Sequence, residues 1–274
     1  MHTTPFAASW KPLNNITKVF NAGTVNEKTA LYKLCLTLSD GDFVTVIGGN
    51  GAGKSTLLNA ISGVWQPDSG SIKLDGRELT GMPEYKRAKF LGRVFQDPMM
   101  GTAPDMMIEE NLALAARRGM RRGLKWGIGR IEREDYRELL RELDLGLEDR
   151  LTSKVGLLSG GQRQALTLLM AALKQPQLLL LDEHTAALDP RTAAKVLELS
   201  ETIITENSLT TLMVTHNMRD AIAHGNRLIM MDQGRIVLDI SGEEKKRLTV
   251  EDLLSRFASA SGGEFANDRA LLGA

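Results

Sequence analysis

A glycine-rich run near residue 50 has the residue types and the spacing of a phosphate-binding loop. It consists of Gly48, Gly49, Asn50, Gly51, Ala52, Gly53, Lys54, Ser55 and Thr56. The run fits the pattern G-x-x-x-x-G-K-[ST], which a chance glycine-rich turn would match in roughly one chain of this length in a hundred. Glycines let several backbone N–H groups point into one concavity that a side chain would block. Lys54 would bring a positive charge to the β- and γ-phosphates of a nucleotide, and the Ser55 hydroxyl would bind Mg²⁺. We therefore predict nucleotide binding.

The elements on either side of this run would hold it in place. Residues 43–47 (FVTVI) have the composition of a short buried strand, and residues 55–61 have the pattern of a helix. That order of strand, loop and helix is the context that the phosphate-binding pattern requires. The helix would also aim the positive end of its dipole at the bound phosphates.

A second motif lies before another expected helix and narrows the kind of nucleotide-binding protein. It reads Leu158, Ser159, Gly160, Gly161 and Gln162. Its plain interpretation is an N-capped helix start, in which Ser159 and the glycines leave backbone N–H groups free to meet an anion. With both motifs in this order, the chain resembles the ATP-binding cassette (ABC) ATPases, from about Leu13 to Asp239.

The resemblance implies roles for further residues of the hydrolytic site. Leu178 to Glu183 resembles the family's Walker B strand, in which Asp182 would hold Mg²⁺ and Glu183 would polarise the attacking water. Gln96 matches the Q-loop glutamine, a further Mg²⁺ contact beside Ser55 and Asp182. His216, after an apolar strand, matches the switch histidine at the γ-phosphate. The plain alternative for the acidic pair is a helix start after a buried strand.

The resemblance also bears on an aspartate, a histidine and an aromatic residue outside these motifs. Asp189 matches the D-loop aspartate that acts across a dimer interface. His184 follows Glu183 where a proline is common in the family, and we interpret it as a variant that leaves Glu183 intact. Phe20 is our candidate for the aromatic side chain that stacks on adenine. A core phenylalanine at a strand end is an equal interpretation, and Tyr32 is the alternative aromatic.

Composition narrows the class of protein. The chain has 274 residues, of which 42% are hydrophobic and 25% charged, and its 34 Lys and Arg balance its 34 Asp and Glu. A balanced charge argues against nucleic acid as the main partner. The single Cys35 favours a reducing compartment. Residues 1–10 do not have a leader pattern, and no apolar run is long enough to cross a bilayer. We expect a soluble subunit on the cytoplasmic side of the cell membrane.

The order of elements predicts an α/β fold. Two early strands, residues 13–20 and 31–38, are expected to form an antiparallel pair, and later strands alternate with helices as in a parallel sheet. The strand before Gln96 is expected at residues 92–96, and helices at 108–118, 132–143 and 161–173. We predict a P-loop NTPase core with an N-terminal antiparallel β subdomain, a helical insertion near residues 99–157 and a C-terminal helical tail at 241–274. The ABC ATPase domain is expected at residues 1–240.

In the family that the chain resembles, each hydrolytic site is split between two copies, and ATP holds the two together. The resemblance implies Mg²⁺, ATP, a second copy of the chain, transmembrane permease subunits and a solute-binding protein. A soluble ABC ATPase of the DNA-repair or translation type is the alternative, and a non-catalytic regulatory cassette is another. The residues 97–104 and 183–190 also resemble a subgroup of bacterial importers for tryptophan- or tyrosine-like solutes. The motifs do not fix the solute or the direction of transport.

A basic segment in the expected helical insertion has no role in this motif set. It contains Arg117, Arg118, Arg121, Arg122, Lys125 and Arg130, with Trp126 among them. A solvated surface is one interpretation and a nucleic-acid patch is another. The hypothesis that we prefer places it at the membrane side, where anionic headgroups would attract each Arg or Lys by about 1 kcal/mol. Replacing the first four arginines with Gln is then expected to leave the fold intact.

Overall fold

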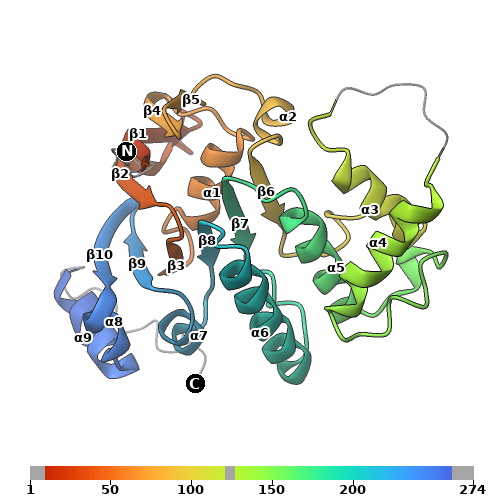
Figure 1. The fold of residues 1–274 in the computed structure, drawn as a ribbon. Helices are drawn as coiled ribbons and strands as arrows, with labels where there is room; N and C mark the ends of the chain where they lie inside the picture. Colours follow the sequence, from red (N-terminus) through yellow and green to blue (C-terminus); the bar gives the residue numbers. More distant parts are fainter. Residues whose placement is uncertain (1–9, 121–126, 261–274) are drawn as a thin grey trace, which may run out of the picture. The chain divides into compact units, whose positions relative to one another are not determined.

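The phosphate-binding run and the acidic pair lie in different units of a computed structural model, which describes residues 10–120 and 127–260 (Figure 1). Unit 1 comprises the described residues up to Arg87 and those from Ser208 onward, and unit 2 comprises Ala88–Asn207. Each unit has its own strands and helices.

Unit 1 begins with an antiparallel sheet in the order β2-β1-β4-β5 (Figure 1). Its strands are β1 (Trp10–Phe20), β2 (Lys28–Ser39), β4 (Ser69–Leu74) and β5 (Arg77–Glu78). On β2, Leu34, Leu36 and Leu38 are buried while Cys35 between them is exposed. Since alternate residues of a strand face opposite sides of its sheet, this pattern fixes the face that packs inward. The predicted antiparallel pairing is confirmed, with Leu13 opposite Leu36.

The second sheet of unit 1 carries the phosphate-binding run at the end of its central strand. Its order is β10-β9-β3-β8, with β3 (Phe43–Gly48), β8 (Thr211–Val214), β9 (Arg227–Asp232) and β10 (Arg235–Ser241). Strand β3 runs parallel to both β8 and β9, and β10 is antiparallel to β9. The helices of this unit are α1 (Lys54–Ser62), α2 (Glu84–Arg87), α7 (Met218–Ala223), α8 (Gly242–Lys246) and α9 (Val250–Ala260).

Helix α9 closes the hydrophobic core beside β9 and β10. Its Leu253 and Phe257 pack in one cluster with Leu228 and Met230 of β9 and Ile240 of β10. Burying a side chain of this size stabilises the fold by about 1.5–3 kcal/mol. Helix α9 is therefore part of the core of unit 1.

The buried Lys245 of α8 ties the same region to α7. Its ammonium group donates to the carbonyl oxygens of Ile222, His224 and Gly225, at the end of α7. A cation at the C-terminal end of a helix is favourable because the last carbonyl groups lack helical partners. Helix α7 is consequently capped by a side chain more than twenty residues further along the chain.

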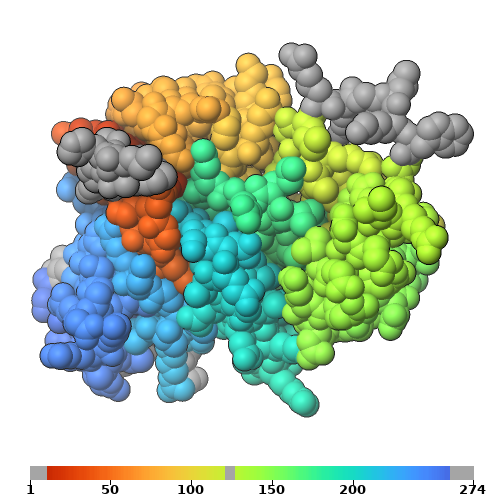
Figure 2. All heavy atoms as spheres, in the orientation of Figure 1, coloured from red at the N-terminus to blue at the C-terminus, as the bar shows by residue number. Residues whose placement is uncertain are grey.

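Unit 2 contains the acidic pair and the second motif. It is built from α3 (Ile108–Ala116), α4 (Arg130–Arg141), a 3₁₀ turn (Val155–Leu157), α5 (Gly160–Ala172) and α6 (Pro190–Glu206), with the parallel strands β6 (Leu91–Val94) and β7 (Leu178–Asp182). Residues Leu178 to Leu181 are all buried. Helix α4 buries Tyr136 and Leu140 and exposes most of its charged residues, and its atoms lie on the face drawn in Figure 2.

The structure departs from the sequence-based predictions at several boundaries. Strand β6 ends at Val94, two residues before Gln96, because the carbonyl oxygen of Phe95 accepts a hydrogen bond from the Gln164 side chain. Helix α3 ends at Ala116 instead of residue 118. The short helices α2 and α8 are missing from the predictions, since four or five residues carry too little hydrophobic periodicity to reveal a helix.

Candidate functional site

The phosphate-binding run requires glycine at two positions for steric reasons. A Cβ atom on Gly48 would lie 2.2 Å from the carbonyl oxygen of Met231, and one on Gly53 would lie 2.5 Å from that of Ala30. Gly53 also has a φ of +101°, a backbone conformation that disfavours residues with a side chain. The loop between β3 and α1 is therefore packed directly against the backbones of β2 and β9.

Lys54 lies back across this loop. Its side chain is buried, and the ammonium group donates to the carbonyl oxygens of Gly48 and Gly49, at 2.8 and 3.2 Å. Gly53 is the N-cap of α1, and as a glycine it makes no side-chain hydrogen bond to the first turn. A positive charge and the positive end of a helix dipole thus meet at one loop, which fits the oxygens of a polyphosphate.

The far end of α1 is held by Arg87, which is fully buried. Its guanidinium donates to the carbonyl oxygens of Ala60 and Ile61 at 2.6 and 2.8 Å, and to that of Met82 at 2.8 Å. Burial lowers the pKa of Arg87 from its ordinary value. These bonds satisfy carbonyl groups in the last turn of α1, and they fix the helix that carries Lys54.

His216 follows the carboxyl end of the strand beside the phosphate-binding run. Strands β3 and β8 are parallel, with Val46 opposite Val214, so Gly48 and His216 both come two residues after this pair. The Thr215 amide extends the pairing by donating to the Val46 carbonyl oxygen at 3.1 Å. The carboxyl ends of adjacent parallel strands are where α/β proteins bind ligands. Unit 1 thus brings the glycine-rich run and the exposed His216 to one edge of its sheet.

Phe20 lies at the end of β1, against an aromatic side chain that the motifs did not identify. The rings of Phe20 and Trp65 meet edge to face, with centroids 5.2 Å apart, and 42% of Trp65 is exposed. Tyr32 is covered instead by the guanidinium of Arg235, 4.3 Å from its ring centroid. No sequence spacing joins Phe20 to Trp65, which comes three residues after the end of α1.

The acidic pair lies at the carboxyl end of β7 in unit 2. Asp182 is the last residue of the strand, and Arg93 Nη2 is 3.3 Å from its Oδ2 atom. Glu183 follows with a φ of +45°, a left-handed conformation that costs energy for a residue with a side chain. Strained backbone of this kind concentrates at functional sites. The sharp turn re-aims the chain directly after the strand.

His184, directly after this turn, is buried and bonded. Its Nε2 atom lies 2.9 Å from the hydroxyl of Ser200 on α6, and only 2% of the residue is exposed. His184 therefore fastens the turn after Glu183 to a helix.

The second motif forms a capping box at the start of α5. The Gln162 amide donates to Ser159 Oγ at 3.3 Å, and the Ser159 amide donates to Gln162 Oε1 at 3.2 Å. This corrects the expectation that the Ser159 amide is free to bind an anion, because that amide donates its hydrogen bond within the capping box. Gly161 is required because a Cβ atom there would lie 2.2 Å from Thr192 Cγ2 on α6.

Asp189 begins α6, beside this motif. Its carboxylate accepts a hydrogen bond from the Thr192 amide at 3.1 Å, and Pro190 occupies the first turn. Hydrogen bonds from the Thr192 hydroxyl and amide lower the pKa of Asp189. Thr192 thus contacts Gly161 and Asp189 together, which links the starts of α5 and α6.

Comparison with known proteins decides the family. A family model described as ABC transporter matches residues 31–186. The tyrosine transport ATP-binding protein of Clostridioides difficile is 47% identical over 248 residues, which cover 90% of this chain and 98% of that protein. An energy-coupling factor transporter ATP-binding protein of Acetivibrio thermocellus is 35% identical, over 82% of this chain and 77% of its own length.

The chain belongs to the ABC transporter family.

Solved structures of ABC cassettes share its fold. A dimeric, post-hydrolysis structure of the cassette MJ0796 with ADP and Pi has a TM-score of 0.72 and 28% identity, and covers 84% of this chain and 98% of that one. The ADP conformation of the cassette MJ1267 has a TM-score of 0.73 and 25% identity, over 94% and 100%. The predicted α/β P-loop NTPase fold is confirmed. This ABC protein is the ATP-binding and ATP-hydrolysing subunit of a membrane transporter, and the soluble DNA-repair or translation alternative is not favoured.

Two arginines of the basic segment serve the ABC protein's own fold. Arg118 donates to the Ala171 carbonyl oxygen at 3.1 Å, and burial lowers its pKa. Arg117 pairs with Glu132 at 2.9 Å. Replacing Arg118 is therefore expected to cost stability, and whether the variant with all four arginines replaced stays folded remains a prediction. The positions Arg121, Arg122, Lys125 and Trp126 lie outside the described residues.

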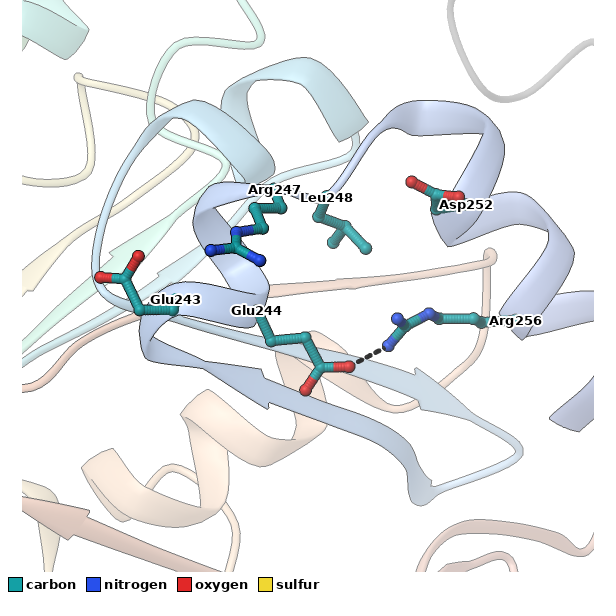
Figure 3. A pocket seen from close by; sticks show the side chains of 6 residues that line it. All are labelled: Glu243, Glu244, Arg247, Leu248, Asp252 and Arg256. Carbon is teal, nitrogen blue, oxygen red and sulfur yellow. Dashed lines mark hydrogen bonds and ion pairs between the residues drawn. The ribbon is translucent and has the colours of Figure 1, made fainter.

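A hollow of about 400 Å³ lies elsewhere in unit 1, between α8 and α9. It is lined by Glu243, Glu244, Arg247, Leu248, Asp252 and Arg256. Glu244 and Arg256 form an ion pair at 2.5 Å, which Figure 3 marks with a dashed line. No residue of the nucleotide-binding motifs lines it. Within the described part of the chain, no helix is both long and apolar enough to cross a membrane.

Proposed function

We propose that this chain energises the uptake of an amino-acid-like solute as one of two identical ATPase subunits on the cytoplasmic face of a permease. The proposal is supported by the 47% identity to a tyrosine transport ATP-binding protein and by relatives named for methionine import. A solute-binding protein would deliver the solute, since the motifs of this chain recognise only the nucleotide. We propose that residues 1–240 form the ATPase domain, with a helical insertion near 99–157. The proposed C-terminal tail at 241–274 includes α9, which packs into the core of unit 1.

The phosphates would be bound by the run from Gly48 to Thr56. The glycines allow close approach of the backbone, and Lys54 neutralises phosphate charge. Phe20 would stack on the adenine ring, and its contact with Trp65 would hold the Phe20 ring in place. His216 would contact the γ-phosphate from the neighbouring strand end.

A magnesium ion fits the oxygen donors that these motifs offer. Ser55, Asp182 and Gln96 supply a hydroxyl, a carboxylate and an amide oxygen, which are hard ligands of the kind that Mg²⁺ prefers beside phosphates. When bound, the ion supplies charge stabilisation for phosphoryl transfer. Among the described residues, no group of three His, Cys, Asp or Glu could hold a metal by itself. We propose that the phosphates of ATP complete the coordination.

Glu183 is the proposed general base. It directly follows the proposed Mg²⁺ ligand Asp182, and its left-handed backbone turns the chain away from the strand. A carboxylate in this role would accept a proton from the attacking water as the water oxygen bonds to the γ-phosphorus, while the bond from that phosphorus to the β–γ bridging oxygen breaks and ADP leaves. The observation that carries the proposal is this strained turn at the end of the buried β7, within an otherwise unbroken set of motifs.

The partner copy would complete each site. Its Ser159, Gly160, Gly161 and Gln162 would approach the γ-phosphate, and Asp189 would act across the interface. The dimeric cassette structures of relatives support a two-copy arrangement. ATP would favour the closed dimer because the contacts of both copies to one nucleotide exist only there.

The Glu183→Gln variant tests this proposal. We expect it to bind ATP, to lose nearly all turnover, and to elute as an ATP-dependent dimer on gel filtration. Lys54→Ala serves as the control that binds ATP weakly and stays monomeric. Near-normal hydrolysis by Glu183→Gln would contradict the role of Glu183, and a monomer at saturating ATP would contradict the two-copy site.

Uptake assays test the solute separately. Cells that lack this chain are expected to lose ATP-dependent uptake of labelled tyrosine or a related amino acid, and to recover it with the wild-type chain but not with Glu183→Gln. Unchanged amino-acid uptake, with loss of another solute class such as sulfonates, would contradict the proposed solute.

A further inference from the structure

The guanidinium of Arg93 occupies the place beside Asp182 where a cation is expected in the loaded enzyme. In the parallel pair β6–β7, Arg93 lies opposite Leu180, two residues before Asp182. Residues two apart on a strand share a face of the sheet, so the side chains of Arg93 and Asp182 lie on the same side. Their Nη2 and Oδ2 atoms are 3.3 Å apart, and the side chains are only 13% and 15% exposed.

A second contact holds this guanidinium in place. Arg93 Cζ lies 4.5 Å from the centroid of the Phe95 ring, a cation–π contact. The carbonyl oxygen of Phe95 in turn accepts a hydrogen bond from Gln164, a fully buried residue of α5. The arginine is thus anchored between the Walker B strand and the helix that follows the second motif.

Asp182 needs a counter-charge in the absence of metal because its carboxylate is largely removed from water. Breaking a mostly buried ion pair by removing one partner is costly. A divalent cation and a guanidinium at the same carboxylate repel each other, and the repulsion is strong where water is scarce. Arg93 and a Mg²⁺ ion therefore compete for the carboxylate of Asp182.

We propose that Arg93 is the counter-ion of Asp182 in the nucleotide-free protein and competes with Mg²⁺ for this carboxylate. The inference rests on the proposed role of Asp182 as a Mg²⁺ ligand. It assigns Arg93 as a positioning residue, which acts through Asp182. Arg93 stabilises the empty site and raises the Mg²⁺ concentration needed to fill it. Because Arg93 comes three residues before Gln96, loading of the metal is linked to the start of the Q-loop.

Removing the guanidinium should destabilise the empty protein and strengthen Mg²⁺ binding. The Arg93→Met variant keeps an apolar stem for contact with Phe95 and loses the charge. Without nucleotide, it is expected to melt at a lower temperature than the wild type, because Asp182 has lost its counter-ion. In the presence of nucleotide, the Mg²⁺ concentration for half-maximal binding is expected to fall by about three- to tenfold.

The experiment compares Arg93→Met with Arg133→Met, a matched control in the same unit. Arg133 pairs at 2.7 Å with Glu109, a carboxylate that is 5% exposed and belongs to no nucleotide-binding motif. Two quantities are measured for each variant: the melting temperature with and without Mg²⁺ and a non-hydrolysable ATP analogue, and the Mg²⁺ midpoint for binding a fluorescent form of that analogue. The control is expected to lower both melting temperatures equally and to leave the midpoint unchanged.

The outcome for Arg93→Met decides the inference. A lower melting temperature confined mainly to the empty protein, with a lower Mg²⁺ midpoint, supports it. An equal loss of stability in both states with an unchanged or higher midpoint overturns it. Asp182→Asn separates this result from the proposed function: an unchanged midpoint in that variant contradicts the metal role of Asp182 itself. A raised midpoint in Asp182→Asn beside an unchanged one in Arg93→Met overturns only the inference on Arg93.

Discussion

His184 and Ser200 form a buried hydrogen bond, with 2.9 Å between Nε2 and Oγ, directly after the strained turn at Glu183. The Ser200 hydroxyl donates to the Val196 carbonyl oxygen at 2.7 Å, so its oxygen accepts from the imidazole N–H. The pair joins the turn after β7 to the middle of α6. His184 is in this way a structural part of unit 2.

Ser200→Ala is expected to destabilise the protein by about 1–3 kcal/mol, because the buried imidazole N–H loses this acceptor. Urea unfolding measures the change. Thr202→Ala is the matched control, since the exposed Thr202 hydroxyl makes the same kind of bond, to the Glu198 carbonyl oxygen at 3.0 Å. The control is expected to change stability by less than about 0.5 kcal/mol. Equal losses for the two variants would contradict a special contribution of the His184–Ser200 pair.

Gly53→Ala tests the packing of the phosphate-binding loop. A methyl group there would lie 2.5 Å from the Ala30 carbonyl oxygen, so we expect the loop to shift, ATP binding to be lost, and stability to fall by more than about 2 kcal/mol. Gly41→Ala is the control, because Gly41 has a φ of +78° and open space around it. This control should cost only about 1 kcal/mol from backbone strain and keep nucleotide binding. ATP affinity is measured by calorimetric titration and stability by urea unfolding for both variants. Normal ATP affinity in Gly53→Ala would contradict the packing argument.

The Asp189 cap predicts a pH dependence of stability. Hydrogen bonds from Thr192 hold the pKa of this carboxyl below its ordinary value of 3.8. A carboxyl with a lowered folded-state pKa stabilises the fold fully above its unfolded-state pKa, and this stabilisation disappears as the pH falls through the folded-state value. Asp189→Asn keeps the capping acceptor without the charge. We expect its stability relative to wild type to improve as the pH falls from about 5 to about 2, measured by urea unfolding. A pH-independent difference would contradict the role of the charge.

Replacing Arg118 is expected to cost more stability than replacing its neighbour Arg117. Arg118→Gln should lower stability by about 1–3 kcal/mol because it removes a charged donor from the Ala171 carbonyl oxygen. Arg117→Gln should cost about 0.2–1 kcal/mol, since its pair with Glu132 is partly exposed. Thermal unfolding compares them, and a larger loss in Arg117→Gln would contradict this order.

The membrane-side hypothesis for the basic segment needs variants that spare Arg118. Arg121→Gln with Arg122→Gln is expected to weaken binding to anionic liposomes, more so at low salt. The Arg117→Gln variant serves as a comparison for the loss of one charge. Unchanged liposome binding and unchanged assembly with the permease would favour a solvated surface.

The sequence predicts best where local signals agree. The start of helix α6 at Pro190 follows from local signals, because Asp189 caps the helix and Pro190 suits a first turn. The buried run of leucines likewise predicts β7. The predicted end of β6 was wrong, since a side chain from α5 donates a hydrogen bond to the Phe95 carbonyl oxygen. Contacts between distant positions were also beyond the motifs: Arg93 and Asp182 are 89 residues apart, and no spacing rule joins them. The same is true of Phe20 and Trp65.

Mixing two inactive variants tests the two-copy ATP site most directly. Lys54→Ala disables the phosphate-binding loop, and Ser159→Arg disables the second motif. In a mixed dimer, one site combines the intact loop of one chain with the intact motif of the other. Each variant alone is expected to hydrolyse no ATP above background. A one-to-one mixture should recover activity, up to about half of the wild-type activity, because a mixed dimer has one working site in place of two. A mixture no more active than its two components would contradict a site shared between two copies.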